Sequence, residues 1–402
     1  MTEPGLFLYD DEQARGFEPF ALTRPASELR AGTSLVRERW EQAVGRGATA
    51  FIAAAHLADF DEPGAPPAGG ATLPAGAVVA NARCIPALAP AAAAEAWTCD
   101  GRVAAVCIDR PLAAAALRDG RLALEELGRA AGARTAAIAG RWVEGPWDYV
   151  RTLSAQLADD VPAQARSLQL VDPPQAVVLG GHAVLVEAGA TVEPLVCFDV
   201  TGGPVLVRAG ATVRAFTRLV GPCYVGSHAT VMGDRIEACS IGEWSRVHGE
   251  ASNTIVLGHA NKSHEGFVGH SYLGRWVNLG AGTTTSNLKN TYGTVVLWTP
   301  EGVRDTGMQF LGSLVGDHAK TAIGTRLTTG TVVGAGANVF GDAAPPKYVR
   351  PFAWGAAGSD AYRLPDFLGV VEKVMGRRGV PLGERGRRSL TAAYARAAEA
   401  GR

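Results

Sequence analysis

An apolar side chain recurs at every sixth position through much of the C-terminal half of this 402-residue chain. The pattern is clearest in three runs: Val207, Val213, Leu219, Val225 and Val231; Phe267, Leu273 and Leu279; and Leu327, Val333 and Val339. Glycines beside these positions supply the backbone freedom that tight corners need. Three hexads form one triangular coil of roughly 18 residues, and stacked coils bury a continuous apolar core. The repeat therefore predicts a parallel β-helix.

The remaining sequence predicts two further parts. Residues 1–172 have the composition of an α/β domain that ends in a proline-containing connector at 160–174, residues 173–344 form the β-helix, and residues 345–402 form a helical cap. Apolar runs and helical composition place the elements of the first part: strands at Leu6–Tyr9, Ala77–Ala80 and Val103–Ile108, and helices at Ser34–Val44, Pro90–Trp97 and Pro111–Ala131. Two tail helices, Pro365–Met375 and Ser389–Glu399 with Ser389 as its cap, are expected to cover the open end of the solenoid.

Composition excludes several classes of function. A formal net charge of −1 leaves no basic surface for nucleic acid or for an acidic membrane. No apolar run reaches membrane-spanning length, and the N-terminus lacks the basic-then-apolar pattern of a signal peptide. Six cysteines without a CxxC pair indicate reduced thiols. We therefore expect a cytoplasmic protein that acts on small molecules.

The hexad repeat breaks in one place. After the coil Gly274–Gly280, the segment Ala281–Leu311 is inserted before the period resumes near Val315, and just upstream GHANKSHEGFVG (258–269) forms an irregular corner. Insertions in solenoids map to loops on one face, which is often the binding face. Four of the five lysines in the chain flank this region or the end of the solenoid: Lys262, Lys289, Lys320 and Lys347. Their ammonium groups suit recognition of a phosphate or sugar, or they only solvate this face.

His264 on this corner has three interpretations. It can be a hydrogen-bonded structural residue, or a general base, because an imidazole titrates near neutral pH. As a third alternative, His228 lies 36 residues before it, two full coils, and His270 six residues after it. Histidines stacked in this way would resemble the zinc site of γ-class carbonic anhydrases, which share the fold.

The run NKSHEGFVGHSYLGRWVNLGAGTTTSNLK (261–289) resembles the acetyltransferase active site of the GlmU family, bifunctional N-acetylglucosamine-1-phosphate uridylyltransferases and glucosamine-1-phosphate acetyltransferases. The resemblance implies a left-handed β-helix, a homotrimer, and acetyl-CoA bound as co-substrate between neighbouring helices. It also implies roles for single residues. His264 would be the catalytic base and Asn287 would orient it or the acceptor amine. Lys262, Phe267 and Lys289 would bind substrate. The turn Gly280, Ala281, Gly282 and Thr283 would bind the cofactor and stabilise the oxyanion.

Over nearly its full length the chain is similar to a group of GlmU-like sugar nucleotidyltransferases. The motifs that carry this resemblance are LYDD (8–11), LTRPASELRAG (22–32), PWD (146–148), NLKNTYG (287–293), GDHAKT (316–321), TGTVVG (329–334) and PPKYVRPFAWG (345–355). Sugar-nucleotide pyrophosphorylases have a Gly-rich phosphate loop followed by a lysine, whereas this chain has one glycine in the corresponding stretch and Ala26 and Ser27 in place of the lysine. Asp10, Asp11 and Arg24 could still hold a phosphorylated or Mg²⁺-bound ligand; equally, the two aspartates could end a strand and Arg24 pair with a carboxylate.

These resemblances favour an acyl-CoA-dependent transferase, most simply an acetyltransferase, that acts on a sugar phosphate or nucleotide sugar. Phe267 and Leu288 stand where that family has tyrosines, so the acceptor can differ. The adjacent pair Asp317 and His318 is an alternative source of the base, although neighbouring residues on a strand point to opposite faces. Two alternatives stay open: a sugar-1-phosphate nucleotidyltransferase with an altered loop, and a non-catalytic scaffold that senses ligands.

Overall fold

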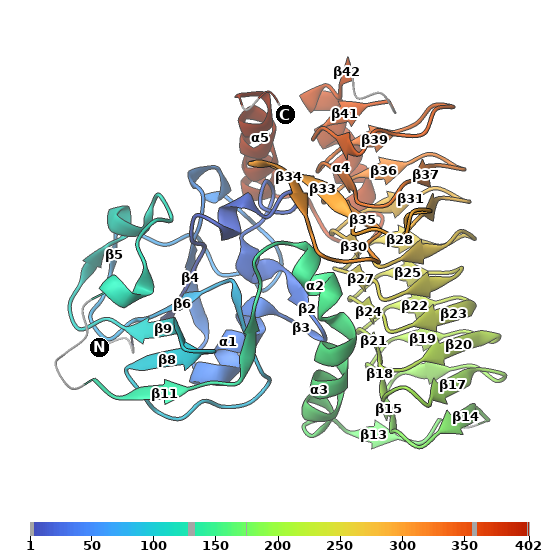
Figure 1. Cartoon of the computed structure of the whole chain (residues 1–402), viewed down its shortest axis with the longest axis horizontal. Coiled ribbons are helices and arrows are strands. Elements are labelled where there is room, and N and C mark those ends of the chain that lie inside the picture. The colour runs from blue at the N-terminus through green and yellow to red at the C-terminus, as the bar shows by residue number, and fades with distance from the viewer. Residues whose placement is uncertain (1–3, 128–132, 174, 356–359, 400, 402) are drawn as a thin grey trace. The chain divides into compact units, whose positions relative to one another are not determined.

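The computed structural model describes residues 4–127, 133–173, 175–355, 360–399 and 401 (Figure 1). The chain divides into two compact units, Met1–Pro146 with Leu382–Gly401 and Trp147–Pro381. Each unit has its own hydrophobic core. Within the described ranges, no helix has the length and apolar character needed to cross a membrane.

A mixed six-stranded sheet, in the order β11-β8-β9-β6-β1-β4, forms the centre of the first unit. Its strands are β1 (Leu6–Tyr9), β4 (Ala48–Ile52), β6 (Val78–Asn81), β8 (Ala96–Cys99), β9 (Arg102–Cys107) and β11 (Thr135–Ala137). Strands β4, β1 and β6 run parallel, whereas β9 is antiparallel to β6. Every residue of β1 and β6 is buried, as parallel strands covered on both faces require. The three predicted strands are thus confirmed to within one residue.

Short ladders and helices surround this sheet. The ladders are β2 (Arg30–Ala31) with β3 (Ser34–Leu35), β5 (Thr72–Leu73) with β10 (Leu112–Ala113), and β7 (Cys84–Pro86) with β12 (Gly140–Trp142). The helices are α1 (Val36–Val44), α5 (Glu384–Glu399) and the 3₁₀ turns η1 (Ala14–Gly16), η2 (Ala26–Glu28), η3 (Ala55–Leu57), η4 (Ala114–Leu117) and η5 (Leu124–Glu126). All six cysteines are free thiols.

Two predicted helices of the first unit are wrong. Pro90–Trp97 is a loop that leads into strand β8, because the backbone amides of Glu95 and Ala96 bond to the carbonyl of Arg134 at the sheet edge. An eight-residue helix is marginal on its own, so sheet pairing wins over the high helix propensity of alanine. The described part of Pro111–Ala131 holds only β10, η4 and η5, and residues 128–131 lie outside the described ranges.

The second unit is a parallel β-helix, as the hexad repeat predicts, and its coils stack from β14 to β41 (Figure 1). One side of the coils contains β13 (Leu170–Val171), β15 (Val184–Glu187), β18 (Val205–Val207), β21 (Cys223–Val225), β24 (Ser240–Ile241), β27 (Ile255–Val256), β30 (Tyr272–Leu273), β35 (Ser313–Val315), β38 (Thr331–Val333) and β40 (Tyr348–Val349). The next side contains β14 (Val177–Gly180), β17 (Cys197–Val200), β20 (Thr217–Val220), β23 (Asp234–Glu237), β26 (Ala251–Ser252) and β29 (Val268–Gly269); β32 (Thr284–Thr285) and β37 (Arg326–Leu327) form a separate pair. The remaining side contains β16 (Thr191–Val192), β19 (Thr212–Val213), β22 (Thr230–Val231), β25 (Arg246–Val247), β28 (Asn261–Lys262), β31 (Asn278–Leu279), β36 (Lys320–Thr321), β39 (Asn338–Val339), β41 (Ala353–Trp354) and β42 (Asp360–Ala361).

The coils are not uniform in length. Paired inward residues on the first side are 18, 16, 15 and 17 positions apart along the series Val207, Val225, Ile241, Val256 and Leu273. The shorter coils shift the hexad register, so the inward residue of β29 is the buried Val268 and not the half-buried Phe267. The predicted place of Phe267 in the core column is therefore wrong by one residue.

Rings form a column along one corner of the solenoid. Its members lie on successive coils with neighbouring ring centroids 4.3 to 6.3 Å apart: His228, Trp244, His259, Trp276 and His318. Each has a left-handed backbone, with φ between 53° and 64°. Trp244 is 42 % exposed, whereas Trp276 is only 4 % exposed because the rings of His259 and His318 pack on either side of it.

Helices from the described ranges pack on the solenoid. Helix α2 (Trp147–Arg151) precedes α3 (Leu153–Ala165), which packs on β18 and β21 and buries Leu153, Leu157 and Val161. This apolar stripe at a spacing of four residues keeps Pro162 inside the helix, contrary to the predicted connector. Helix α4 (Leu364–Gly376) packs through Phe367 on the last coils.

The tail helices differ from the prediction in their partners. Helix α4 lies on the solenoid as expected, whereas α5 belongs to the first unit, where it contacts η3 and Arg388 pairs with Asp59 at 2.9 Å. Helix α5 begins at Glu384, so Ser389 is a buried residue within the helix and not its N-cap.

The predicted insertion leaves the solenoid and folds back on it. Pairing on the first side passes directly from Leu273 to Val315. Strands β33 (Val296–Thr299) and β34 (Gly302–Asp305) form a hairpin in the intervening excursion, residues 286–311. At its base the amide of Leu311 donates to the carbonyl of Asn287 at 2.9 Å. The hairpin is anchored where Trp298 stacks on Tyr348, with ring centroids 3.7 Å apart.

Candidate functional sites

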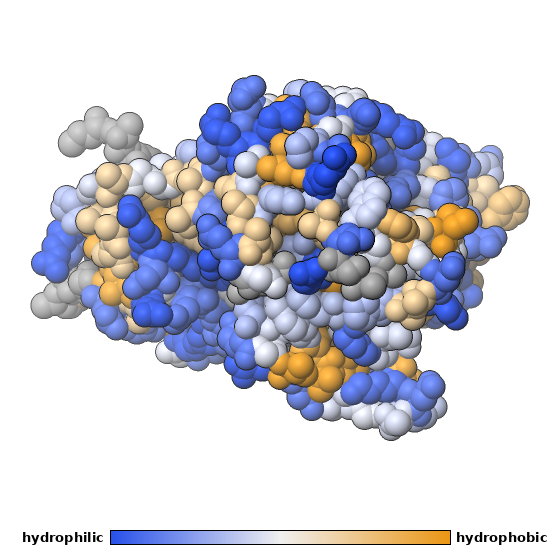
Figure 2. Space-filling view, turned by 90° about the horizontal axis from the view of Figure 1, so that it is seen from above, coloured by the Kyte–Doolittle hydropathy of each residue, from blue (hydrophilic) through white to orange (hydrophobic). Residues whose placement is uncertain are grey.

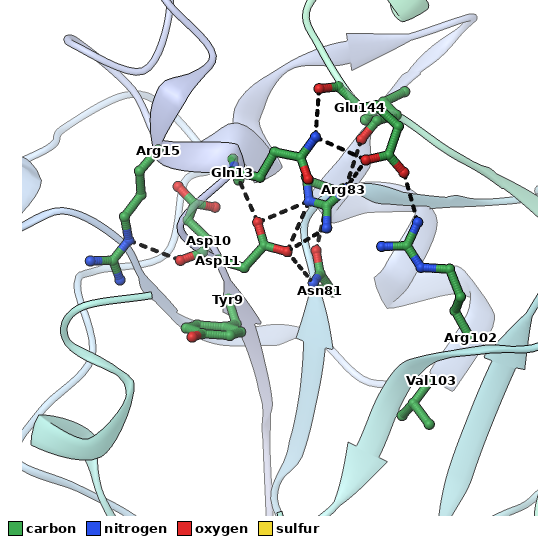
Figure 3. A network of polar contacts seen from close by, with 12 residues as sticks. Tyr9, Asp10, Asp11, Gln13, Arg15, Asn81, Arg83, Arg102, Val103 and Glu144 are labelled. Atoms are coloured by element: carbon green, nitrogen blue, oxygen red, sulfur yellow. Dashed lines mark hydrogen bonds and ion pairs between the residues drawn. The ribbon is translucent and has the colours of Figure 1, made fainter. Parts of the chain in front are cut away.

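The strand order of the first unit creates a natural place for a ligand. Strand β1 pairs with β4 on one side and with β6 on the other, so the chain reverses its direction of travel across the sheet beside β1. Ligands of open α/β sheets bind at the carboxyl ends of the strands at such a switch point. Asp10 and Asp11 follow β1 there, and Asn81 and Arg83 end or follow β6 (Figure 3).

Asp11 is held by four donor groups at this edge. Its carboxylate accepts from Arg83 Nε at 2.8 Å, from Asn81 Nδ2 at 2.9 Å and from the Ala14 amide at 2.9 Å, and it forms an ion pair with Arg83 Nη2 at 2.8 Å. Burial alone would raise the pKa of Asp11, but the hydrogen bonds and charge of Arg83, with the other donors, lower it below its ordinary value. Asp11 is therefore a fixed anion that orients Arg83.

Glu144 extends the network towards solvent. Arg83 Nη1 and Arg102 Nη1 donate to its two oxygens at 2.9 and 2.7 Å, and Gln13 Nε2 donates at 2.8 Å (Figure 3). The Arg102 guanidinium lies 3.9 Å from the ring centroid of Trp142. The side chains of Arg102 and Glu144 are 44 % and 51 % exposed. Two guanidinium groups thus meet at an accessible carboxylate, and an arriving phosphate could replace that carboxylate as their partner.

Asp10 behaves differently from its neighbour. Its Oδ2 accepts from the Ala26 amide at 3.0 Å, and its Oδ1 is buried without a hydrogen-bond partner among the described residues. Burial raises the pKa of Asp10 to about 7, although the Ala26 amide and Arg15 oppose that shift. Arg15 Nε donates to the backbone carbonyl of Asp10 at 2.9 Å. Asp10 is thus a buried carboxyl that is largely neutral below pH 7.

Asp10→Asn is expected to remove a pH-dependent loss of stability. The folded pKa of about 7 lies above the ordinary aspartate pKa of 3.8, so the folded state binds more protons than the unfolded state between these values. The contribution of Asp10 to stability is therefore full at low pH and falls as the pH rises from about 4 to 7. Urea denaturation at pH 5 and pH 8 should show that the wild type loses more stability than the variant across this interval.

Asp59→Asn provides the control for this comparison. Asp59 has 38 % of its side chain exposed and pairs with Arg388, whose hydrogen bond lowers the pKa of Asp59. Because that group titrates below the tested interval, Asp59→Asn should change stability equally at pH 5 and pH 8. A stability difference between wild type and Asp10→Asn that does not change with pH would contradict the placement of Asp10 as a buried acid.

Arg24 pairs with a carboxylate, which is the structural alternative to ligand binding that the sequence left open. Its side chain is 1 % exposed and donates through both terminal nitrogens to Glu62, at 2.7 and 3.0 Å. It therefore cannot serve as the phosphate ligand without breaking a buried bidentate pair.

The carboxylates do not fit a Mg²⁺ site. The carboxylate oxygens of Asp11 accept hydrogen bonds from Arg83, Asn81 and the Ala14 amide. The buried Asp10 favours its neutral form. Magnesium prefers several accessible oxygen ligands in octahedral geometry. Among the described residues, no three His, Cys, Asp or Glu side chains gather where they could hold a metal ion.

The sequence motif indicates Asp10 and Asp11 but not the residues that contact them. Arg83 and Asn81 follow a predicted buried strand at its carboxyl end, and that position could have marked them. Glu144 and Gln13 gave no such signal, because their contact joins residues 131 positions apart and depends on the finished fold.

In the solenoid, His264 lies on the corner between β28 and β29 and is exposed. Lys262 on β28 takes the inward position that pairs with Val247, and its ammonium donates to the carbonyls of His248 and His264 at 2.6 and 2.8 Å. Burial lowers the pKa of Lys262 to about 8. Lys262 thus supports the His264 corner from inside, and contact with a phosphate would require its ammonium to leave both carbonyls.

The Gly280–Thr283 turn is built from hydrogen bonds between coils. The Gly280 amide donates to Thr321 at 3.0 Å, the Gly282 amide donates to Glu265 at 3.0 Å, and the Thr283 amide donates within the turn at 3.1 Å. Gly282 has φ +70°, which suits glycine. Because the amides of Gly280, Gly282 and Thr283 are already used, the turn in this chain does not offer them to an oxyanion; Ala281 is half-buried beside them.

The single chain does not bring His264 and Asn287 together. Asn287 lies at the base of the excursion, where its Nδ2 is 2.9 Å from Nδ1 of His270, on the corner after β29. Phe267 lies beside the same strand, and Lys289 donates to the carbonyl of Thr294 within the excursion.

The side chains of the alternative pair, Asp317 and His318, have different partners. Asp317 accepts from the Arg275 amide at 2.7 Å, whereas the His318 ring belongs to the ring column.

The zinc interpretation is wrong. His228 stacks on Trp244 in the ring column, His264 lies on another corner, and His270 packs on Phe310. The predicted stacking assumed coils of equal length, but the coils between His228 and His264 are shortened, so 36 residues do not return to the same corner.

Comparison with known families agrees with the fold of the first part. Residues 6–167 match the family model described as sugar nucleotidyl transferase, which covers less than half of the chain. No curated protein matches the chain significantly. The matched segment includes β1 and β6 together with Asp11, Arg83 and Glu144 at their carboxyl edge. The chain therefore carries a sugar nucleotidyltransferase-like domain, followed by a parallel β-helix.

Proposed function

We propose that this protein transfers an acyl group, most simply acetyl, from an acyl-CoA to a sugar phosphate or nucleotide sugar on its β-helix. The observation that carries the proposal is the corner at His264. An exposed imidazole lies on the corner between β28 and β29, and a buried lysine donates to its backbone carbonyl. The resemblance of residues 261–289 to GlmU-type acetyltransferases supplies the reaction class.

In this reaction His264 takes a proton from the acceptor amine or hydroxyl as that group attacks the thioester carbonyl. A bond from the acceptor to the carbonyl carbon forms, the carbon–sulfur bond breaks, and the leaving thiolate receives the proton from the imidazolium. Asn287 orients the acceptor. Because His264 and Asn287 lie on different corners of one chain, we propose that they meet across the boundary between two copies.

The first domain would bind the nucleotide or sugar-phosphate portion of a substrate. Arg83 and Arg102 already face a carboxylate at the accessible edge of the sheet. Phosphate oxygens form charge-assisted hydrogen bonds of the same kind with guanidinium groups. This role needs no metal ion, in agreement with the poor fit of Asp10 and Asp11 to Mg²⁺.

A thermal-shift assay tests this proposal at the level of binding. We expect acetyl-CoA and a nucleotide sugar each to raise the melting temperature, because a ligand at 100 times its Kd stabilises the folded state by about 2.7 kcal/mol. Coenzyme A lacking the acetyl group and free phosphate provide the controls. No shift with acetyl-CoA at any concentration up to the millimolar range would contradict the acyltransferase proposal.

We also expect a homotrimer. Leu195 and Phe216 lie on consecutive coils at one corner of the solenoid and are 62 % and 76 % exposed. Figure 2 shows that one face of the molecule has apolar side chains among polar ones. Exposed apolar flanks of this kind are typical of faces that a neighbouring copy covers. Sedimentation equilibrium should give three times the chain mass, and Phe216→Ser should weaken the assembly. A monomeric wild type at micromolar concentration would contradict both the trimer and a shared active site.

A second candidate function is sugar-1-phosphate nucleotidyl transfer, which the family match of residues 6–167 favours. Asp10 favours its neutral form and Asp11 already pairs with Arg83, so the two carboxyl groups at the switch point argue for a slow reaction at most. Fast, magnesium-dependent release of pyrophosphate from a nucleoside triphosphate and a sugar 1-phosphate would establish this function. Binding of both ligands without either reaction would instead favour a sensing scaffold.

A further inference from the structure

His270 lies on a corner of the solenoid and has no role in the reaction proposed above. It follows β29 with a left-handed backbone, φ 49°, and its amide donates to the carbonyl of Ser252 at 2.8 Å. Its ring stacks on Phe310 of the excursion, with centroids 5.4 Å apart and planes 28° from parallel. The same ring contacts Asn287 through Nδ1 at 2.9 Å. The corner thus joins the solenoid to the base of the excursion.

The contact with Asn287 fixes both side chains. An amide nitrogen can only donate, so Nδ1 of His270 accepts and the ring carries its proton on Nε2. Burial lowers the pKa of His270, which keeps the ring in this neutral form. With the amide nitrogen of Asn287 directed at the ring, its oxygen Oδ1 is directed away from it. The pair therefore presents one donor, Nε2–H, and one acceptor, Oδ1.

The side chains of Phe267 and Asn287 occupy the space where a Cβ at position 269 would lie, so only glycine fits there. A Cβ on Gly269 would lie 2.3 Å from the ring of Phe267 and 2.8 Å from Nδ2 of Asn287. Glycine therefore allows the Phe267 ring and the Asn287 amide to share the space over one strand residue. Phe310, whose ring stacks on the imidazole of His270, is 41 % exposed. Flat apolar rings beside a neutral donor and acceptor are a surface that suits the C–H face and the hydroxyl or amide groups of a sugar.

We propose that the His270 corner is the sugar subsite of the β-helix, in which His270 is a positioning residue that acts through Asn287 on the acceptor sugar. The inference rests on the proposed transferase function and adds the place and chemistry of acceptor binding. The sugar ring lies against Phe267 or Phe310, and its hydroxyl or amine donates to Oδ1 of Asn287. The donor and acceptor are uncharged, so the corner recognises the sugar and not its phosphate.

Three variants and one control test this role. His270→Ala removes the acceptor for Asn287. His270→Asn restores an acceptor near the position of Nδ1 and tolerates the left-handed backbone, as Asn253 does with φ 43°. Gly269→Ala displaces the Asn287 amide or the Phe267 ring by steric overlap. Gly293→Ala lies in the same excursion, where the added Cβ meets only Thr291 Oγ1 at 3.9 Å, and it serves as the control.

Isothermal titration calorimetry with glucosamine 1-phosphate and, separately, with acetyl-CoA gives the readout. The loss of one oriented hydrogen bond corresponds to about a tenfold change in affinity. We expect His270→Ala and Gly269→Ala to weaken sugar binding about tenfold, with acetyl-CoA binding unchanged. His270→Asn and Gly293→Ala should stay close to the wild type.

Each other outcome is decisive. Wild-type sugar affinity in both His270→Ala and Gly269→Ala overturns the subsite, and so does equal loss of sugar and acetyl-CoA binding, which would indicate a structural role. Failure of His270→Asn to restore affinity overturns the action through Asn287. A wild type that binds acetyl-CoA but not the sugar also overturns the inference. A wild type that shows the expected sugar-binding pattern but transfers no acetyl group would refute the proposed function and leave the subsite intact.

Discussion

His264→Ala is expected to lower the rate of acetyl transfer by about 10² to 10⁴-fold, because that is the usual contribution of a positioned general base. Stability should change by less than about 0.5 kcal/mol, since the side chain is exposed on a corner and outside the stacked core. Binding of acetyl-CoA should also persist. Steady-state kinetics with acetyl-CoA and an amino-sugar phosphate, together with calorimetric melting, measure both effects.

Glu265→Ala is the matched control for this experiment. Glu265 is exposed on the same corner, and its contact with the Gly282 turn is made by its backbone carbonyl, which the substitution keeps. It should retain activity within a few-fold of the wild type. Equal turnover in wild type and His264→Ala would refute the assigned role. A lower melting temperature with activity lost only in proportion would indicate that His264 is structural.

Arg83→Ala is expected to destabilise the first unit by about 3 to 5 kcal/mol, because removal of one partner leaves a buried charge without compensation. Arg83 has only 6 % of its side chain exposed and holds both Asp11 and Glu144. Its loss removes the ion pair that lowers the pKa of Asp11, so the remaining carboxylate faces burial with fewer donors. Urea denaturation followed by tryptophan fluorescence measures the change.

Arg102→Ala separates this effect from a general loss of charge. Arg102 also pairs with Glu144, but both side chains are about half exposed. Exposed ion pairs and cation–π contacts each contribute about 1 kcal/mol or less. The control should therefore cost much less than Arg83→Ala. Similar losses in the two variants would contradict the central place of Arg83 in the network.

The hexad repeat predicts the β-helix and the inward residues of its regular coils. It fails to predict the inward residues where the coil length departs from 18 residues. Valines at Val207 and Val225 are one coil apart, as the hexads indicate. The following coils contain 16, 15 and 17 residues, and each missing residue moves the later side chains by one position. Phe267 consequently leaves the core column, and Lys262 enters an inward position that no hexad rule assigns to a lysine.

The candidate sites show the same limit for contacts between distant residues. Motif resemblance marked His264, Asn287 and Asp11 by their local sequence. It could not show that Asn287 pairs with His270, because the excursion that brings them together has no repeat of its own. Nor could it show that Arg24 is tied to Glu62, which lies 38 residues away in a loop. Local pattern therefore selected many of the residues, whereas three-dimensional packing decided their partners.

Mass spectrometry of the reaction products tests whether the protein transfers an acetyl group to a sugar. The wild-type protein is incubated with isotopically labelled acetyl-CoA and a panel of amino-sugar phosphates and nucleotide sugars, and free CoA thiol is measured in parallel. We expect one labelled acetyl group on the sugar for each thiol released, with both signals lost in His264→Ala. Protein that binds acetyl-CoA and the sugars but releases no thiol and forms no acetylated sugar would contradict it.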